Sequence, residues 1–547
     1  MNAFAFLSNI ARRFPSQPAI VQGEESITYR EFEQRALCIG GNLRAQGLAR
    51  GERLAFCLNN SPRILELVYS CFAAGLIVVP INVRLHPREI AYILHNSGAR
   101  VFVHGPEHQA ALLEHLDSFP ASTQRICTGA VAGAGAYEAL LAPQSALTAA
   151  IDVEAADPCW LFYTSGTTGR PKGAIWTHRM IRVVVMNYLA DIDNIQPGEV
   201  IVHAAPLSHG SGIVALPAIA RGATNLLLNT KSFEPRALFE AIQRSKASHV
   251  AFLAPTQIVK MLEDYQPGEF DLSSLRAVCY GGAPVYVEHL RQAIRTFGPV
   301  FAQIYGQGES PITITGLSAA EHGRLLSSGD ARIGSAGTVR TDVEARCVDE
   351  NDHPVPAGVA GEVVVRGDIV MPGYWNEPAA SAEALRNGWL HTGDIGMFDQ
   401  GGYLFLLDRA KDMIITGGNN VYPREVEEII VQHPAVATAV VVGIPHEYWG
   451  EAVHAVVLRQ AGSTVSAEEI IQYCGQSLAG YKKPKSVEFV TELPVSAYGK
   501  VLRREVRERY WQGRSSRIGG GEGQSVPGSI PASAPAQGAA RSEDVRS

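Results

Sequence analysis

The stretch YTSGTTGRPKG, residues 163–173, has the composition of a loop that approaches a polar ligand closely. Glycines leave backbone N–H groups free to point at an anion, the Ser and Thr hydroxyls donate further hydrogen bonds, and Lys172 adds positive charge. The spacing is not that of a P-loop, because neither Ser nor Thr follows Lys172 and Pro171 disfavours helical angles at Arg170. On spacing alone, phosphate binding and an ordinary Gly/Ser-rich surface loop are about equal alternatives.

The residues that lead into this loop favour the binding alternative. CWLFY, residues 159–163, has the pattern of a buried strand, so we expect the loop to leave the carboxyl end of a sheet strand. Open α/β sheets bind their ligands at that edge.

Helix and strand patterns alternate on both sides of the loop. Thr28 and Glu31 form a capping box ahead of apolar residues at helical spacing, and residues 53–58 and 101–104 have the pattern of buried strands. After the loop the alternation continues to about residue 305. It predicts an α/β fold in which parallel sheets are covered by helices.

Changes of pattern along the chain predict its domains. Residues 333–366 contain short strand patterns with Gly and Pro turns, which indicate a β-rich subdomain within a large N-terminal domain, residues 1–409. Residues 410–511 mix strand and helix patterns and predict a small, mobile α+β C-terminal domain. Residues 512–547 have almost nothing apolar to bury and predict a disordered tail.

The composition argues against several classes of protein. A net charge of −7, with no strongly basic half, argues against nucleic-acid binding. The 8 cysteines contain no C-x-x-C pair, which favours reduced thiols over disulfides or a zinc site. The longest apolar run, residues 67–81, is too short for a membrane span, and the N-terminus lacks a secretory signal pattern. We therefore expect a cytoplasmic protein without a transmembrane segment.

Six segments in this order resemble the signatures of the adenylate-forming (AMP-binding) enzymes, and most closely those of their acyl-CoA synthetase branch. The similarity runs from about residue 5 to residue 510 and implies ATP-dependent activation of a carboxylic acid. After the loop at 163–173, the segments are YGGAP (280–284), YGQGES (305–310), WLHTGD (389–394), DRAKDMIITGGNNVYPREVE (408–427) and PVSAYGKVLRR (494–504).

The resemblance implies a binding site for ATP. In it, the loop holds the β- and γ-phosphates, three residues of YGGAP line the adenine slot, a tyrosine stacks on the base beside a glycine, and an Asp–Arg pair binds the ribose hydroxyls. The loop residues are Thr164, Ser165, Gly166, Thr167, Thr168, Gly169 and Lys172, and the adenine-slot residues are Gly281, Gly282 and Ala283. The tyrosine and glycine at the base are Tyr305 and Gly306, and the ribose-binding pair is Asp394 and Arg409.

The resemblance also implies how catalysis is arranged. Glu309 binds Mg²⁺, because a carboxylate suits a hard cation beside phosphates. Lys500, from the small domain, reaches the acyl carboxylate and the α-phosphate, and with Lys172 and Glu309 it completes the catalytic residues. Lys411 is the hinge, and Gly418 lines the tunnel for the pantetheine arm of coenzyme A. Taken singly, the lysines would be ordinary solvated charges; the motif context gives them these roles.

His209 and Gly210 border the acyl pocket by the same resemblance. The helix pattern at residues 178–189 is mostly apolar, so we expect it to wall that pocket and to favour a fatty, aryl or alicyclic acid. Arg182 within it could pair with a second carboxylate, although a helix arginine more often points to solvent. The residue before His209 is usually aromatic in the family, but here it is Ser208.

The expected reaction is AMP-forming acid–CoA ligation: the acid attacks ATP, pyrophosphate leaves, and the thiol of coenzyme A displaces AMP. No carrier module follows residue 510, and residues 203–216 offer no carboxylate for a substrate ammonium, which argues against a peptide-synthetase domain. Two alternatives stay open. One is transfer to a separate carrier protein; the other is a non-catalytic nucleotide-binding regulator, because Gly308 replaces the family's usual Thr or Ser. A homodimer also stays open.

Overall fold

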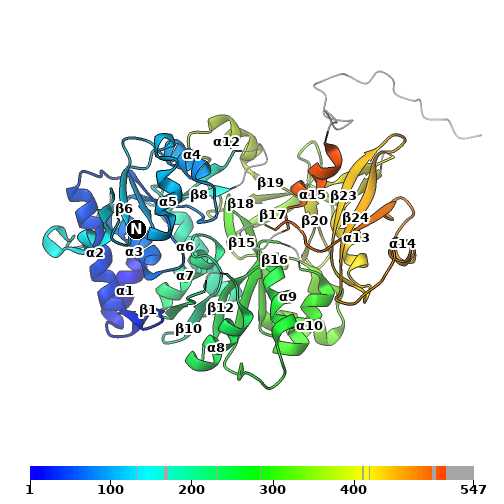
Figure 1. Ribbon diagram of the computed structural model, residues 1–547, viewed down its shortest axis with the longest axis horizontal. Coiled ribbons are helices and arrows are strands. Elements are labelled where there is room, and N and C mark those ends of the chain that lie inside the picture. The colour runs from blue at the N-terminus through cyan, green and yellow to red at the C-terminus, as the bar shows by residue number, and fades with distance from the viewer. Residues whose placement is uncertain are drawn as a thin grey trace, which may run out of the picture.

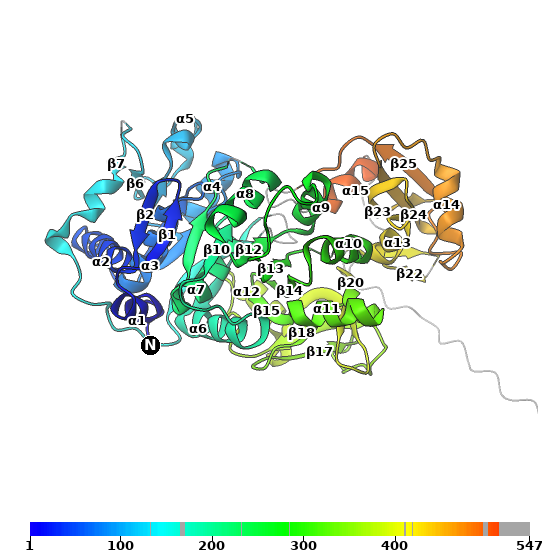
Figure 2. The ribbon, with the colours of Figure 1, turned by 90° about the horizontal axis from the view of Figure 1, so that it is seen from below.

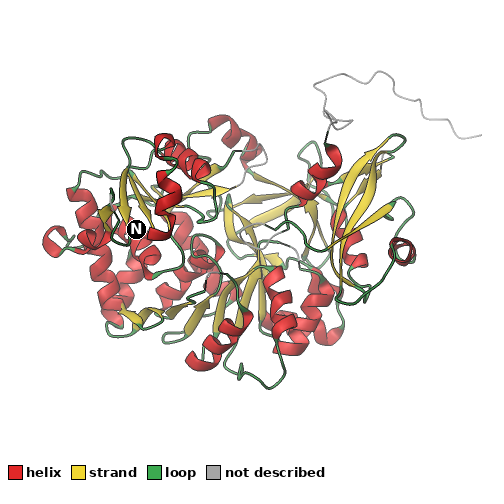
Figure 3. Cartoon of the chain, viewed as in Figure 1, coloured by secondary structure: helices red, strands yellow, loops and turns green. Residues whose placement is uncertain are grey.

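The computed structural model describes residues 1–131, 133–164, 170–230, 232–283, 285–409, 412–417, 419–495 and 501–512. Within these residues the strands form four sheets, and most helices lie around the outside of the two large sheets (Figure 1 and Figure 3). The α/β architecture predicted from the alternating patterns is confirmed.

The strand that leads into the glycine–hydroxyl loop belongs to a seven-stranded sheet. Its neighbouring strands are parallel, except that β9 returns antiparallel to β8. In spatial order the strands are β7 (Gly135–Ala136), β6 (Gln124–Cys127), β5 (Val101–His104), β3 (Arg53–Cys57), β4 (Ile77–Pro80), β8 (Pro158–Thr164) and β9 (Lys172–Thr177).

A nine-stranded sheet follows, parallel in its centre and antiparallel at both edges. In spatial order its strands are β16 (Thr338–Val339), β15 (Ser310–Leu317), β14 (Phe301–Gln307), β13 (Ala277–Gly281), β12 (His249–Leu253), β10 (Val200–His203), β11 (Thr224–Leu227), β1 (Pro18–Gln22) and β2 (Glu25–Thr28).

The predicted β-rich subdomain is an antiparallel sheet, and the C-terminal part of the chain has a sheet of its own. The former contains β17 (Glu344–Val348), β18 (Gly361–Arg366), β19 (Leu390–Phe398) and β20 (Leu404–Arg409). The latter contains β22 (Asn419–Val421), β21 (Ile414–Thr416), β24 (Gly450–Arg459) and β23 (Val436–His446), with β25 (Ser486–Val490) paired to β24.

The helices fill most of the longer connections between these strands. They are α1 (Ala5–Arg13), α2 (Tyr29–Ala45), α3 (Pro62–Ala74), α4 (Pro87–Ser97), α5 (Gln109–Leu113), α6 (His178–Asn187), α7 (Gly210–Arg221), α8 (Pro235–Ser245), α9 (Pro255–Asp264), α10 (Val287–Phe297), α11 (Ala319–Ser328), α12 (Pro378–Ala384), α13 (Pro423–Ile430), α14 (Ala467–Gly475) and α15 (Arg503–Trp511).

Local sequence signals account for several helix boundaries. Thr28 and Glu31 form the predicted capping box at the start of α2: Thr28 N donates to Glu31 Oε2 at 2.8 Å, and Glu31 N donates to Thr28 Oγ1 at 3.3 Å. Helix α3 begins at Pro62 and ends at Ala74, and the following Gly75 has a φ of 65°, the left-handed conformation that glycine adopts without strain. None of the described helices combines the length and apolarity that crossing a bilayer requires.

The described residues after Arg409 lie together at one end of the molecule, coloured yellow to red in Figure 1 and lying at the same end in Figure 2. Its core is built from α13, α14 and the sheet around β23 and β24. The domain boundaries at 409/410 and 511/512 remain predictions. Apart from Gln512, the predicted tail lies outside the described residues.

Candidate active site

The glycine–hydroxyl loop connects two antiparallel strands rather than a strand and a helix. Thr164 ends β8 and Lys172 begins β9, and the two residues are paired in register. Tyr163 fixes the end of β8, because its Oη donates to Asn96 Oδ1 at 2.6 Å. The predicted phosphate-binding residues between Thr164 and Lys172 lie outside the described residues, namely Ser165, Gly166, Thr167, Thr168 and Gly169.

Glu309 lies close to the start of β9. It belongs to the turn between β14 and β15, and its side chain is buried. Tyr374 Oη donates to Glu309 Oε1 at 2.6 Å, and Lys172 Nζ lies 5.3 Å from the centroid of the Tyr374 ring. The structure therefore brings Lys172 and Glu309 to one place, with Tyr374 contacting both.

The surroundings of Glu309 fit a magnesium ion that arrives with a nucleotide. No described basic side chain forms an ion pair with this buried carboxylate, and its electrostatic interaction with Arg409 acts from farther away. A buried carboxylate is costly without a closely placed cation. The described residues contain no cluster of three or more His, Cys, Asp or Glu that would enclose a metal. Mg²⁺ commonly uses one or two carboxylates together with substrate phosphates and water, so a single carboxylate suffices.

Asp394 and Arg409 face each other on β19 and β20. Arg409 Nε lies 2.5 Å from Asp394 Oδ1, and Tyr305 Oη donates to Asp394 Oδ2 at 2.7 Å. Burial lowers the pKa of Arg409, but Asp394 and its acidic neighbours outweigh that effect and raise the pKa. Burial, and then Asp394, raise the pKa of Tyr305, so its hydroxyl stays a donor. The structure thus brings together the two residues of the predicted ribose-binding pair. Little of the Tyr305 ring is exposed, and the stacking of this ring on adenine stays a prediction.

The predicted adenine-slot residues begin with Gly281, the last residue of β13, where close backbone packing also demands glycine. An ideal Cβ on Gly281 would lie 2.5 Å from Ile304 O, and one on Gly306 would lie 2.4 Å from Ile312 N. Gly282 has a φ of 77°. The close packing and backbone conformation of the protein thus explain these glycines without any ligand. The contact of Gly281, Gly282 and Ala283 with an adenine base stays a prediction.

The predicted acyl-pocket residues lie at the start of α7, beside two phenylalanines that sequence reasoning missed. The ring centroids of His209 and Phe162 are 5.0 Å apart, and an ideal Cβ on Gly210 would lie 3.1 Å from the Phe252 ring. Burial lowers the pKa of His209 to about 3, so the imidazole is neutral. Phe162 and Phe252 are half-buried residues near the carboxyl ends of β8 and β12, whose other residues are mostly buried. Their position near that end of a strand is the sequence signal by which they could have been found.

Helix α6, expected to wall the acyl pocket, packs against α7, β9 and β15. Met180, Ile181 and Val184 are among its buried residues, whereas Met186 is exposed. Arg182 is half-buried and has no ion pair with any described residue. This packing places α6 beside the helix that begins at Gly210, and its role as a wall of the acyl pocket stays a prediction.

A buried ion-pair cluster lies next to the predicted hinge. Arg503 in α15 pairs with Asp408 at 2.7 Å and with Glu427 in α13 at 2.8 Å. Sequence reasoning missed this cluster, although Asp408 and Glu427 are the first and last residues of one signature segment. The predicted hinge Lys411, tunnel residue Gly418 and catalytic Lys500 lie outside the described residues.

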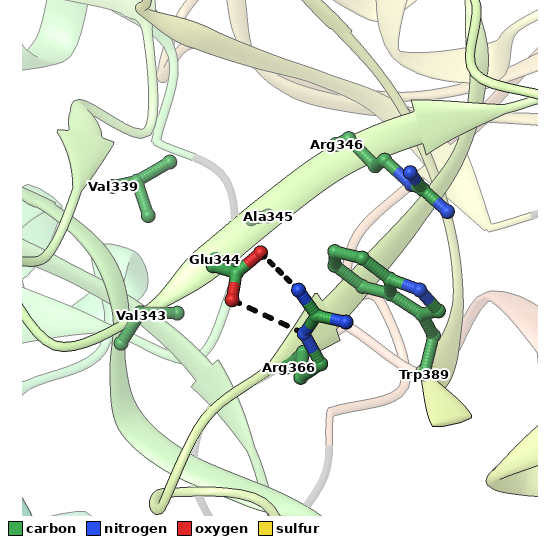
Figure 4. A pocket seen from close by; sticks show the side chains of 7 residues that line it. All are labelled: Val339, Val343, Glu344, Ala345, Arg346, Arg366 and Trp389. Atoms are coloured by element: carbon green, nitrogen blue, oxygen red, sulfur yellow. Dashed lines mark hydrogen bonds and ion pairs between the residues drawn. The ribbon is translucent and has the colours of Figure 1, made fainter.

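A hollow of about 600 Å³ on the β-rich subdomain shares no residue with the predicted site (Figure 4). Trp389 lies there between two guanidiniums, with Arg346 Cζ at 4.1 Å and Arg366 Cζ at 4.6 Å from its ring centroid. Arg366 is also paired with Glu344 at 2.5 Å. This hollow is therefore separate from the predicted active site. Its lining residues are Val339, Val343, Glu344, Ala345, Arg346, Arg366 and Trp389.

Comparison with known proteins matches two family models to this chain. The AMP-binding enzyme model matches residues 7–375, and the AMP-binding enzyme C-terminal domain model matches residues 425–500. A feruloyl-CoA synthase from Amycolatopsis sp is 38% identical over 508 residues, which cover 91% of this chain and 97% of that protein.

Two further proteins extend the comparison. The fatty acid–[acyl-carrier-protein] ligase ScoC from Streptomyces coeruleorubidus is 33% identical over 511 residues, covering 93% of this chain and 96% of that protein. The crystal structure of the anthranilate CoA ligase AuaEII in complex with anthranoyl-AMP superimposes with a TM-score of 0.85 at 26% identity, covering 93% of this chain and 97% of that one.

Proposed function

Because the chain belongs to the AMP-binding enzyme family and is an AMP-forming acid–CoA ligase acting on an apolar acid, we propose that its acid is aromatic and that the site described above activates it. The observation that carries this proposal is the pair of half-buried phenylalanines, Phe162 and Phe252, beside His209 and Gly210. Flat side chains favour a flat substrate through stacked or edge contacts. The similarity to a feruloyl-CoA synthase supports the same choice.

In the proposed site, the ATP phosphates lie along Lys172 and the loop from Thr164 to Gly169. Glu309 would hold Mg²⁺, which neutralises phosphate charge when it is bound. The adenine lies against residues 281–283 with Tyr305 and Gly306. The close approach of Lys172 and Glu309 to Tyr374 supports this arrangement.

The ribose lies against Asp394 and Arg409. Asp394 Oδ1 is ion-paired with Arg409, and Asp394 Oδ2 accepts from Tyr305 and Gln307, but a carboxylate has about four lone-pair sites and can accept a ribose hydroxyl as well. Arg409 would then hold the Asp394 carboxylate in position through their ion pair.

Activation requires cations because the carboxylate attacks the α-phosphorus while pyrophosphate leaves, and negative charge accumulates on the phosphate oxygens. Lys500 would reach those oxygens and the acyl carboxylate, whereas Lys172 would hold the departing phosphates. A preorganised charge of this kind typically contributes on the order of 10²–10³ in rate.

Thioester formation requires Lys500 to withdraw and the pantetheine arm to enter. Residues 410–511 would move as a domain about Lys411, and Gly418 would face the tunnel through which the thiol arrives. The thiolate then attacks the acyl carbon and AMP departs with the bonding electron pair. All 8 cysteines are free, which suits the reducing cytoplasm, where we place the reaction. A homodimer stays open.

The test is a pyrophosphate-release screen over hydroxycinnamic, benzoic, medium-chain and long-chain fatty acids, with and without coenzyme A. We expect the highest kcat/KM for an aryl acid and AMP release that depends on coenzyme A. Phe252→Ala should lower kcat/KM for the aryl acid by about tenfold, since an aromatic pair contributes about 0.5–1.5 kcal/mol beyond its buried area. A preference for palmitate that survives this change would contradict the aryl proposal.

Loading of a carrier protein, besides coenzyme A, is a second candidate activity because of the similarity to ScoC. It predicts that an acyl carrier protein, added without coenzyme A, also causes AMP release. Lys500→Ala should abolish most activation while leaving ATP binding nearly intact, and unchanged turnover would refute the role of Lys500.

A further inference from the structure

The side chain of Tyr374 contacts both charged groups that we assign to the phosphates and the metal. Its Oη donates a hydrogen bond of 2.6 Å to Glu309 Oε1, and Lys172 Nζ lies 5.3 Å from its ring centroid. Among the described residues, no other group donates a hydrogen bond to the Glu309 carboxylate. The direction of that carboxylate thus depends on one neutral donor.

The backbone around Tyr374 is paired with β9 just after Lys172. Trp375 N donates to Gly173 O at 2.8 Å, and Ile175 N donates to Gly373 O at 3.1 Å. These bonds hold the ring beside the lysine without any help from the phenol hydroxyl.

The same segment is also tied to the turn that carries Glu309. Met371 N donates to Glu309 O at 2.9 Å. On its other side the segment is held by α12, because Tyr374 N donates to Ser381 Oγ at 2.8 Å. Removing the Tyr374 hydroxyl should therefore leave the ring, the turn and the start of β9 in place. The hydroxyl can be tested separately from the fold.

The phenol hydroxyl is the donor of this hydrogen bond. A carboxylate offers acceptor sites, and hydrogen bonds from a hydroxyl to a carboxylate are short and directional.

We propose that Tyr374 is a positioning residue of the ligase reaction, which aims the Glu309 carboxylate at the metal accompanying ATP and holds an aromatic surface beside Lys172. The inference rests on the proposed role of Glu309. Partners that orient a metal-binding carboxylate typically change metal affinity by about 10- to 100-fold when they are removed.

The test is Tyr374→Phe, with ATP binding measured by calorimetry during a MgCl₂ titration, without acid or coenzyme A. We expect the Mg²⁺ concentration at half-maximal effect to rise at least about tenfold, while ATP affinity in EDTA and the melting temperature stay at wild-type values. In turnover, the KM for Mg²⁺ should rise while kcat at saturating Mg²⁺ changes little. Tyr403→Phe is the matched control, because Tyr403 Oη donates to Glu321, outside the site, and its Mg²⁺ dependence should be that of wild type.

Glu309→Gln separates the two levels of the argument. If it leaves the Mg²⁺ dependence unchanged, the proposed metal role of Glu309 fails. If it shifts that dependence and Tyr374→Phe does not, the positioning role alone is wrong. An equal loss of ATP affinity in EDTA and in Mg²⁺ would show that Tyr374 acts only structurally. The double variant should resemble Glu309→Gln alone, because the hydroxyl acts through that carboxylate.

Discussion

Gly308 lies so close to Thr164 that an ideal Cβ on Gly308 would stand 2.3 Å from Thr164 Cγ2. The same Cβ would lie 2.9 Å from Phe162 Cδ1, and Gly308 O accepts from Trp176 Nε1 at 2.7 Å. The space of the family's usual Thr or Ser side chain is therefore filled by β8. Glycine at this position lets the strand before the phosphate loop approach the turn that carries Glu309.

Restoring a family-like hydroxyl should harm this chain rather than improve it. We expect Gly308→Ser to raise the KM for ATP about tenfold, since inserting atoms into a filled space typically costs about 1–3 kcal/mol. Adding Thr164→Ser removes the colliding methyl and keeps the hydroxyl, so the double variant should recover part of the loss. The measurement is the ATP dependence of pyrophosphate release; a Gly308→Ser enzyme equal to or better than wild type would contradict the packing argument.

Arg409 should contribute more to ATP binding than its position at the end of β20 suggests. Arg409→Gln removes the charged partner of Asp394, and a hydrogen bond between charged groups contributes about 1.5–3 kcal/mol, so the KM for ATP should rise roughly 10- to 100-fold. Arg366→Gln is the control, because the Arg366–Glu344 pair is exposed, and exposed pairs contribute about 0–1 kcal/mol. Equal effects from the two variants would exclude a binding role for Arg409.

The hinge cluster predicts a stability loss that depends on pH. Arg503→Met leaves Asp408 and Glu427 buried without their cation, which typically costs about 3–5 kcal/mol. Burial raises the pKa of both carboxyls in the folded protein and Arg503 lowers it, so removing Arg503 raises the folded pKa further. At low pH the variant can protonate these carboxyls, whereas at high pH it must bury them ionised, and this part of its stability is lost as pH rises through the folded pKa. The melting-temperature gap to wild type should therefore be wider at pH 8 than at pH 5.

Its control is the neighbouring arginine. Among the residues that the structure describes, Arg504 forms an ion pair with Glu508 alone, and its side chain is 72% exposed. Arg504→Met should therefore shift the melting temperature little at any pH. A gap for Arg503→Met that stays constant from pH 5 to pH 8 would contradict the linkage.

His209 should not titrate during the reaction. Burial lowers its pKa to about 3, so the ring is neutral throughout the range in which the enzyme works, and its contribution to stability is present above about pH 6.5 and lost as pH falls toward 3. We expect His209→Asn to lower kcat/KM for the acid through lost contacts while leaving the shape of the pH profile unchanged between pH 5.5 and 8. Loss of an inflection near pH 6.5 in the variant would show that His209 does ionise.

Much of the fold could be predicted because its signals are local. Alternating apolar patterns predicted the parallel sheets, and Thr28 with Glu31 predicted the start of α2, because each depends on residues a few positions apart. Asp394 and Arg409 could be paired only through the family resemblance, and the structure then placed them opposite each other on adjacent strands.

By itself, the sequence determined the α/β class, the family and the residue types available for phosphate, metal and ribose. Tertiary structure alone decided that Tyr374 contacts a glutamate 65 positions earlier in the chain, that Phe252 lies against Gly210, and that Arg503 pairs with both Asp408 and Glu427. The physical reason is that periodicity and capping act over one or two turns or strands. Contacts between distant segments, in contrast, depend on how whole sheets and helices pack, which no short pattern specifies.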